Sequence, residues 1–553
     1  MPRIGTWTRA LVALLVVPAQ ATLGGTVDSF DVREATIDGV HNALFTGLTT
    51  CRTVVSSFIT RIETFNPTIN AVISLNPEAL EIADGLDQAL AAGNVTGKLF
   101  CIPILLKDNY DAVGMNTTGA NLDLAGNRPT RDAPTVKAFK DEGAIILGKV
   151  NLHELALEGL SVSSLGGQTI NPYDHSRTPG GSSGGTGAAI ATSFAVFGTG
   201  TDTVNSLRSP ASANSLVSVR PTRGLITRAG VIPISYTQDA VGPIARNVKD
   251  LAVALTVMGS IGFDSADNVT ALAPPDVIGR DYSSGLYGGS LRGLRLGVLD
   301  GFYNHTGSAE TTPVNEAMVE MVDFLTAQGA DIVNVTEPIY NATAILAKLD
   351  VQTSEYRQQL DSYLDGAGPD GTRPASFNEL YTSGKFLVIP SQYNYVNTAF
   401  TSSTSNASYA TAQLGIQNLT TALRATFSDN QLDAVIYPEQ KNLVVKVGSP
   451  SQSGRNGILA ALTGTPVVTV PVGFSPPTDE APVGVPIGME ILGLPFTESK
   501  LLNIAAHITQ QYPVRKMPPF ANHSVEVNEY SGVPVITANT GNIPAQYPIG
   551  VLS

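Results

Sequence analysis

A tract of glycine and serine at residues 179–187 most constrains the fold, because it leads directly into an apolar segment at residues 188–197. Glycine-serine tracts often serve as flexible linkers. A linker is not expected to run straight into so apolar a segment. Small residues at the start of an apolar helix instead allow backbone N–H groups and short hydroxyls to lie close to a bound molecule. The tract therefore predicts a site at the mouth of a buried helix.

Two further segments carry groups suited to acyl transfer without histidine. Lys107 follows residues 99–106, which are nearly all apolar and predict a buried strand that presents the amine at its end. Burial lowers the pKa of a lysine from its ordinary value of about 10.4, and a neutral amine can act as a base. Ser206, in the segment Gly-Thr-Asp-Thr-Val-Asn-Ser-Leu-Arg at residues 200–208, supplies a nucleophilic hydroxyl. Taken alone, a surface lysine in a turn and an ordinary loop serine remain the alternatives.

Together these segments resemble the amidase signature family, in a secreted, fungal-type form. The resemblance implies that Ser206 is the acylated nucleophile, that Ser182 is the bridging serine in a cis peptide setting, and that Lys107 is the base. It implies an amidase that hydrolyses a carbon–nitrogen amide bond through this triad and an acyl-enzyme intermediate. It also implies an α/β fold: one large domain with a central mixed β-sheet and helices on both faces. The similarity covers residues 180–185, 200–208, 221–225, 229–234, 238–246, 466–474 and 488–493.

One departure from the family pattern lies in the nucleophile turn. The family usually has two glycines before the nucleophile, where backbone N–H groups form the oxyanion hole, and this chain has Val204 and Asn205. Valine is penalised at positive φ because of its branched Cβ, whereas asparagine adopts it at modest cost. We therefore assign Thr203, Val204 and Asn205 to oxyanion and substrate binding, and expect either a narrower acyl pocket with an extra donor or a weakened oxyanion hole.

Four other functions remain open on the sequence. The same site fits an acyltransferase or amide-forming enzyme, an ester-cleaving enzyme, or a degenerate protein that binds without catalysis. A rival mechanism reads residues 180–184 as the G-x-S-x-G elbow of an α/β-hydrolase, with His507 or His523 as the triad histidine. An elbow should directly follow a hydrophobic strand, however, and residues 171–179 are not one.

The organisation of the chain favours one large unit. Strand-like runs alternate with helical ones from residue 143 to residue 510, which is typical of α/β layering. We divide the chain into a signal peptide at residues 1–21, an amidase signature domain at 22–517 and a C-terminal tail at 518–553. Residues 365–405, rich in Gly, Ser, Thr and Asn, are expected to form loops over the mouth of the site.

The amino terminus predicts export. Arg3 and Arg9 precede a short apolar core, and Ala19 and Ala21 complete an A-x-A cleavage site. The core is shorter than the roughly 20 apolar residues that span a bilayer. We predict cleavage after Ala21 and secretion without stable membrane insertion, with an uncleaved anchor as the alternative.

Sequons and cysteines fit the same route. Cys51 and Cys101, the only cysteines, either form a disulfide or remain two buried thiols. The possible N-glycosylation sites are Asn94, Asn116, Asn268, Asn304, Asn334, Asn341, Asn406, Asn418 and Asn522, of which Asn116 is expected to be buried because it lies near the Lys107 strand.

Charge and ligand patterns limit the partners. The formal net charge is −14 and no cluster of Lys and Arg is present, which argues against a nucleic acid partner. The six histidines show no metal-binding spacing, and two cysteines cannot build a thiolate zinc site, so no metal or cofactor is predicted. The predicted partner is a small-molecule amide substrate, and the oligomeric state stays open.

Overall fold

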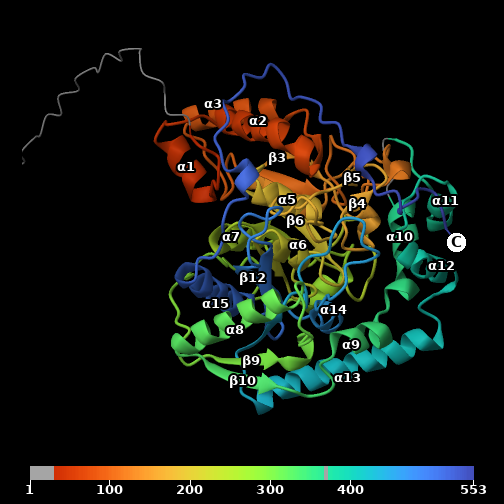
Figure 1. Ribbon diagram of the computed structural model, residues 1–553. Helices are drawn as coiled ribbons and strands as arrows, with labels where there is room; N and C mark the ends of the chain where they lie inside the picture. Colours follow the sequence, from red (N-terminus) through yellow and green to blue (C-terminus); the bar gives the residue numbers. More distant parts are fainter. Residues whose placement is uncertain (1–29, 367–370, 553) are drawn as a thin grey trace, which may run out of the picture.

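A mixed sheet of 11 strands forms the centre of the computed structural model, which describes residues 30–366 and 371–552 (Figure 1). The strands of the chain are β1 (Val72–Leu75), β2 (Pro103–Lys107), β3 (Ile145–Val150), β4 (Val162–Ser163), β5 (Gly167–Gln168), β6 (Phe197–Asp202), β7 (Val217–Arg220), β8 (Ala240–Ala245), β9 (Arg295–Leu299), β10 (Asp331–Val335), β11 (Ala434–Pro438), β12 (Val467–Phe474) and β13 (Pro486–Leu492). The spatial order in the sheet is β1-β3-β2-β6-β8-β7-β12-β13-β11-β9-β10, and β4 and β5 form a separate hairpin.

Parallel and antiparallel pairs alternate in blocks across this sheet. Strand β2 pairs in parallel with both β3 and β6, while β8, β7, β12 and β13 pair antiparallel with their neighbours. Helices flank the sheet, which confirms the predicted α/β class and the single large domain. They are α1 (Ile37–Phe45), α2 (Cys51–Ile69), α3 (Ala79–Ala91), α4 (Pro134–Asp141), α5 (Gly184–Ala191), α6 (Arg208–Ala213), α7 (Val248–Met258), α8 (Thr312–Ala327), α9 (Ala342–Leu349), α10 (Gln352–Asp365), α11 (Phe377–Thr382), α12 (Tyr393–Thr401), α13 (Ala407–Asp429), α14 (Ile458–Thr463) and α15 (Glu498–Gln511).

The two interior strands β2 and β6 bring the predicted motifs together. Every residue of both strands is buried, as expected for strands covered on both faces. Because β2 and β6 run in parallel, their carboxyl ends lie at the same edge of the sheet. Lys107 ends β2, and the nucleophile turn follows β6. Helix α5, which begins in the glycine-serine tract, packs against both strands.

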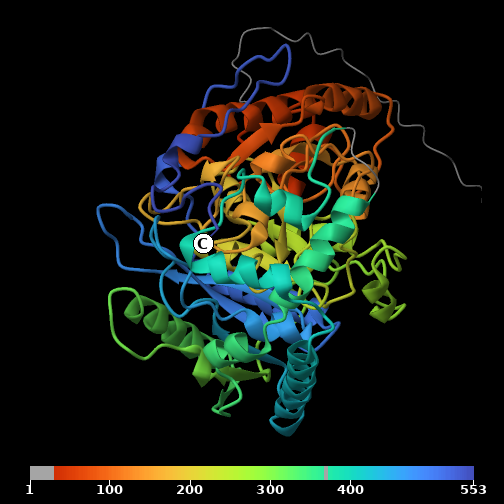
Figure 2. The ribbon, with the colours of Figure 1, turned by 90° about the vertical axis from the view of Figure 1, so that its right-hand side faces the viewer.

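The expectation of loops at residues 365–405 is wrong in part. Helices α11 and α12 form there, and with α10 they lie across one side of the molecule (Figure 2). Ser376 caps α11 by accepting a hydrogen bond from the Glu379 N–H, and the apolar residues Phe377, Val396 and Ala399 pack into a cluster beneath these helices. The polar composition of this segment favoured a prediction of loops. Its few apolar residues form helices because they pack against other parts of the chain.

The C-terminal tail runs across the surface of the same body (Figure 1). The Asn539 N–H donates to Asn70 Oδ1 at the end of α2 (3.0 Å), and Asn542 exchanges hydrogen bonds with the Gln168 backbone. Tyr547 is buried in a small apolar cluster with Leu160 and Leu387. The tail therefore connects α2, the β4–β5 hairpin and the segment after α11.

Cys51 and Cys101 form a disulfide with a Cα–Cα distance of 5.7 Å. It links the first residue of α2 to the segment that enters β2. The predicted signal peptide, residues 1–21, lies outside the described residues. Within residues 30–366 and 371–552, no helix combines the length and apolarity needed to cross a membrane.

Candidate active site

Lys107 is fully buried at the end of β2 and faces two hydroxyl groups. Its Nζ lies 2.7 Å from Ser182 Oγ and 2.8 Å from Thr201 Oγ1. Burial lowers the pKa of Lys107 to about 7, although the charges of Asp202 and Asp239 partly oppose this effect. A large fraction of the amine is therefore neutral near pH 7 and able to accept a proton.

Ser182 lies at the start of α5, and the peptide bond between Gly181 and Ser182 is cis. The Ser182 carbonyl accepts a hydrogen bond from the His153 N–H (3.0 Å), which ties the tract to the segment after β3. Gly180 has a φ of +69°, and a Cβ there would lie 2.8 Å from the Ser209 carbonyl oxygen. Glycine is required at this position on both counts.

Ser206 lies in the turn between β6 and α6 with 7% of its surface exposed. Its carbonyl accepts a hydrogen bond from the Ser183 N–H (3.4 Å), so the nucleophile turn and the glycine-serine tract are in contact. The structure thus brings the three predicted residues, Lys107, Ser182 and Ser206, to one place at the edge of the sheet.

The backbone N–H groups of Val204, Asn205 and Ser206 donate no hydrogen bond to any of the described residues. Backbone N–H groups in buried segments are almost always paired, so three unpaired ones in succession are available to an acceptor from a bound molecule. Neither Val204 nor Asn205 has a positive φ. The glycine replacements therefore cost no left-handed strain, and three N–H groups of the turn have no protein acceptor among the described residues.

Side chains anchor the turn from behind. The Thr203 hydroxyl donates to Asp239 Oδ1 (2.7 Å), and the Val204 side chain packs in an apolar cluster. The Asn205 side chain is 1% exposed and its Nδ2 donates to Glu439 Oε1 (3.1 Å). Asn205 therefore directs its amide into the protein and away from any substrate, so the expected extra donor in the pocket is not there.

A buried ion-pair network holds both ends of the turn. Asp202 accepts hydrogen bonds from Arg208 (3.0 Å), from Arg220 (2.7 Å) and from the Leu207 N–H (3.0 Å). Arg208 also contacts Glu490 (2.8 Å). The two guanidinium groups hold the pKa of Asp202 at about 2 despite its complete burial. Asp202 therefore stays ionised at all moderate pH values, and its ion pairs brace the turn.

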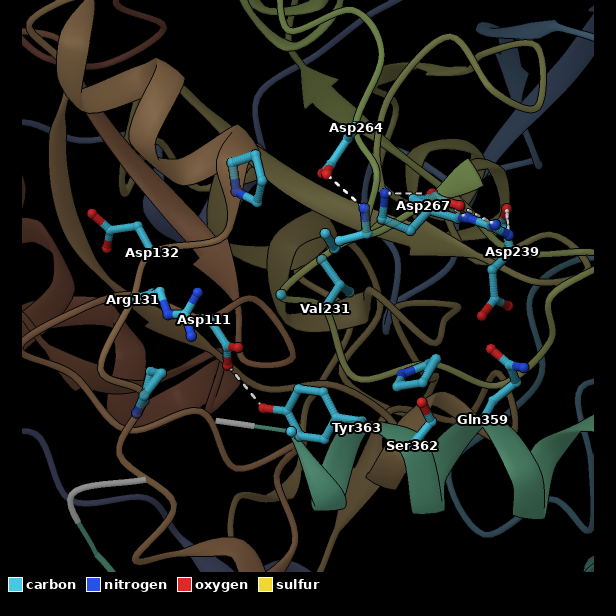
Figure 3. A pocket seen from close by; sticks show the side chains of 18 of the residues that line it. Asp111, Arg131, Asp132, Val231, Asp239, Asp264, Asp267, Gln359, Ser362 and Tyr363 are labelled. Carbon is cyan, nitrogen blue, oxygen red and sulfur yellow. Dashed lines mark hydrogen bonds and ion pairs between the residues drawn. The ribbon is translucent and has the colours of Figure 1, made fainter. Parts of the chain in front are cut away.

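A groove of about 650 Å³ is lined in part by Asp239, the residue that contacts Thr203 (Figure 3). Its lining includes five carboxylates, three arginines, and the α10 residues Gln359, Ser362 and Tyr363. Arg228 pairs with Asp267 (2.6 Å), and Tyr363 donates to Asp111 (2.8 Å), whose pKa burial raises to about 6. Asp239 lines both this groove and a small cavity that reaches Thr201 and Thr203. Asp239 therefore connects the groove with the nucleophile turn through its contact with Thr203.

The rival histidine mechanism is wrong. His507 lies on α15, where Gly289 is its neighbour, and neither ring nitrogen bonds to a described residue. The His523 ring packs edge-on against Phe65. Neither histidine approaches Ser182, whose partner is a lysine.

Several residues of the site carried no predicted role. Thr201 and Asp239 lie within the motifs, but only the structure shows that they contact Lys107 and Thr203. Glu439 is distant from these motifs in the sequence, and no sequence pattern marked it as part of the site.

The sequon asparagines are exposed except Asn304, which is half-buried. The expected burial of Asn116 is wrong, because its loop turns the side chain outward to the Ala125 carbonyl (2.8 Å).

Comparisons with known proteins agree with this geometry. The family model described as Amidase matches residues 53–502. A solved peptide amidase from Stenotrophomonas maltophilia is 32% identical with a TM-score of 0.78, and the match covers 89% of this chain and 99% of that one. A probable amidase of Arabidopsis thaliana is 30% identical over 93% of this chain and 96% of its own length. A glutamyl-tRNA(Gln) amidotransferase subunit from Staphylococcus carnosus is 30% identical over 83% of this chain and 93% of its own length.

The family match spans most of the chain and includes all the segments that meet at the edge of the sheet. Relatives from bacteria and a plant align over nearly their full length, so the likeness is that of a whole protein. This chain belongs to the amidase family and is a hydrolase that acts on amides.

Proposed function

We propose that this protein is a secreted, fungal-type amidase in which Ser206 is acylated, Ser182 relays protons and Lys107 is the base. The distance of 2.7 Å between Lys107 Nζ and Ser182 Oγ carries the proposal. A buried amine with a pKa of about 7 beside a hydroxyl is an arrangement for proton transfer, and simple packing does not account for it.

The reaction proceeds in two halves. Neutral Lys107 takes the proton of Ser182 while Ser182 takes the proton of Ser206, and Ser206 Oγ bonds to the amide carbonyl carbon. The oxygen becomes an oxyanion, held by N–H groups of residues 203–206. As the carbon–nitrogen bond breaks, the protonated relay returns a proton to the leaving amine. Water then enters by the same relay, attacks the acyl-enzyme and releases the acid with Ser206 restored.

The unpaired N–H groups also argue against a degenerate binding protein. Loss of one oxyanion donor raises an acyl-transfer barrier by roughly 3 to 4 kcal/mol, and the unpaired N–H groups of the Val204-Asn205 turn support the view that no donor has been lost. An acyltransferase or esterase would use the same residues, so the acceptor and the substrate distinguish these activities.

The substrate that we propose is a peptide amide. The support is the likeness to the peptide amidase and the groove lined by Asp239, the partner of Thr203; its volume of about 650 Å³ lies in the range of sites for molecules of several hundred daltons. Polar and charged side chains in that groove offer partners for peptide N–H and carbonyl groups.

We further propose the boundaries and processing of the chain. Residues 1–21 are a signal peptide removed after Ala21, residues 22–517 form the amidase signature domain, and residues 518–553 are its tail. The exposure of eight of the nine sequon asparagines leaves them accessible to glycosylation, which supports the secretory route. The Cys51–Cys101 disulfide fits an oxidising compartment.

Fluorophosphonate labelling of the purified secreted protein, with peptide mapping, tests the roles of the residues. We expect the adduct on Ser206, its loss in Lys107→Ala and Ser182→Ala, and normal labelling in the control His507→Ala. An adduct on Ser182 would refute the assignment. A panel of peptide, aliphatic and aryl amides with their esters, run with and without an added amine, then tests the substrate and separates hydrolysis from acyl transfer.

A further inference from the structure

Glu439 lies directly behind the nucleophile turn, although it comes from the segment that follows β11. Its Oε1 accepts the hydrogen bond from Asn205 Nδ2 (3.1 Å), and both side chains are buried, with 1% or less of their surface exposed. The contact joins residues 234 positions apart in the chain. Asn205 immediately precedes Ser206, so any displacement of Asn205 moves the nucleophile and its N–H donors.

Gly457 leaves the space that Asn205 occupies. A Cβ at Gly457 would lie 2.3 Å from the Val204 carbonyl oxygen and 2.5 Å from Asn205 Cβ. The glycine that is absent before the nucleophile is thus matched by a glycine on the facing segment, and Glu439 supplies an acceptor for the added amide. Gly457, Asn205 and Glu439 therefore pack together behind the nucleophile turn.

The charges around Glu439 favour its protonated form. Glu490 on β13 and Asp202 on β6 face it with negative charge, and Arg208 on α6 partly compensates them; the Tyr437 hydroxyl lies on the adjoining strand β11. Burial and the Glu490 charge raise the pKa of Glu439 to about 8. Glu439 Oε2 and Glu490 Oε1 are both buried and have no hydrogen-bond partner among the described residues.

We propose that Glu439 is a positioning residue that fixes the nucleophile turn and its oxyanion donors through the Asn205 side chain. Glu439 does not touch the substrate. The turn that glycine usually permits is here built from Val204 and Asn205 and is held from behind by a carboxyl group. The inference rests on the proposed function of Ser206 and of the N–H groups before it.

Two substitutions separate the hydrogen bond from the charge. Glu439→Gln keeps an acceptor for Asn205 and resembles the protonated acid, so we expect kcat at pH 7 within about threefold of wild type. Glu439→Leu removes the acceptor, and we expect kcat to fall roughly 10- to 100-fold with KM within about threefold, because misplaced oxyanion donors affect the transition state most. Glu498→Gln is the matched control: Glu498 is also buried with an unpaired oxygen, but it bonds to the Thr222 N–H (2.8 Å) and is expected to have no effect on kcat.

A double-mutant cycle with Asn205→Gly gives the decisive comparison. If Glu439 acts through Asn205, Glu439→Leu causes no further loss of kcat in the Asn205→Gly background. An equal loss in both backgrounds, or a Gln variant as impaired as the Leu variant, would overturn the proposal. The same cycle read by thermal unfolding needs no catalysis: coupled losses support the contact, and additive losses refute it. A wild type without turnover or labelling would instead refute the function of Ser206, while the stability cycle still tests Glu439.

Discussion

The pKa of Lys107 predicts how the acylation rate depends on pH. With a pKa of about 7, roughly 1% of the amine is neutral at pH 5 and about 90% at pH 8. Because only the neutral form can take the proton of Ser182, the rate constant for acylation should rise about tenfold per pH unit below pH 6 and level off above pH 8. Single-turnover labelling with a fluorophosphonate measures this rate without product release, and circular dichroism over the same range checks that the protein stays folded.

A substitution beside Lys107 assigns the titration. The Thr201 hydroxyl accepts a hydrogen bond from Nζ (2.8 Å) and stabilises the charged form, so Thr201→Val should move the midpoint down by about one pH unit. Thr199→Val is the matched control, because the Thr199 hydroxyl bonds to the Lys107 backbone N–H (3.1 Å) and not to Nζ. An acylation rate constant that stays flat down to pH 4, or a midpoint that does not shift in Thr201→Val, would refute Lys107 as the base.

Three other predictions concern stability and can be checked by urea or thermal unfolding. Lys107→Met should abolish activity but stabilise the fold. The wild-type amine titrates near pH 7 when folded and near 10.5 when unfolded, so wild-type stability rises with pH across this window. The stability advantage of the variant should therefore shrink by about 4 kcal/mol between pH 7 and pH 10, and a constant difference would contradict the lowered pKa. Replacing Cys51 and Cys101 by alanine should lower the free energy of unfolding by about 4 kcal/mol, because the disulfide closes a loop with a sequence separation of 50; unchanged stability would show that the disulfide contributes little. Arg208→Met leaves Asp202 and Glu490 without their shared cation and should cost about 3 to 5 kcal/mol, whereas the exposed pair tested by Lys137→Met should change stability by less than about 1 kcal/mol; equal effects would argue against the bracing role of the network.

The sequence was sufficient for the α/β class and, through the family resemblance, for the central residues of the site. A long apolar run predicted the strand that carries Lys107, because burial on both faces leaves a strong local signal, whereas the strand before Ser206 contains glycine and threonine and was not predicted. It was not sufficient for the supports of the site. Glu439 and Asn205 meet across 234 positions, and the helices at residues 377–401 depend on packing against residues from other parts of the chain. Such contacts leave no periodic pattern in one sequence.

The tail has a consequence for how the protein is made. Asn539 and Asn542 complete hydrogen bonds to Asn70 and Gln168, residues synthesised several hundred positions earlier. Asn70 Oδ1 therefore has no native donor until the tail has been synthesised. A truncation that removes the tail leaves the buried Asn70 Oδ1 without its hydrogen-bond donor, which should lower the stability of the region at the end of α2.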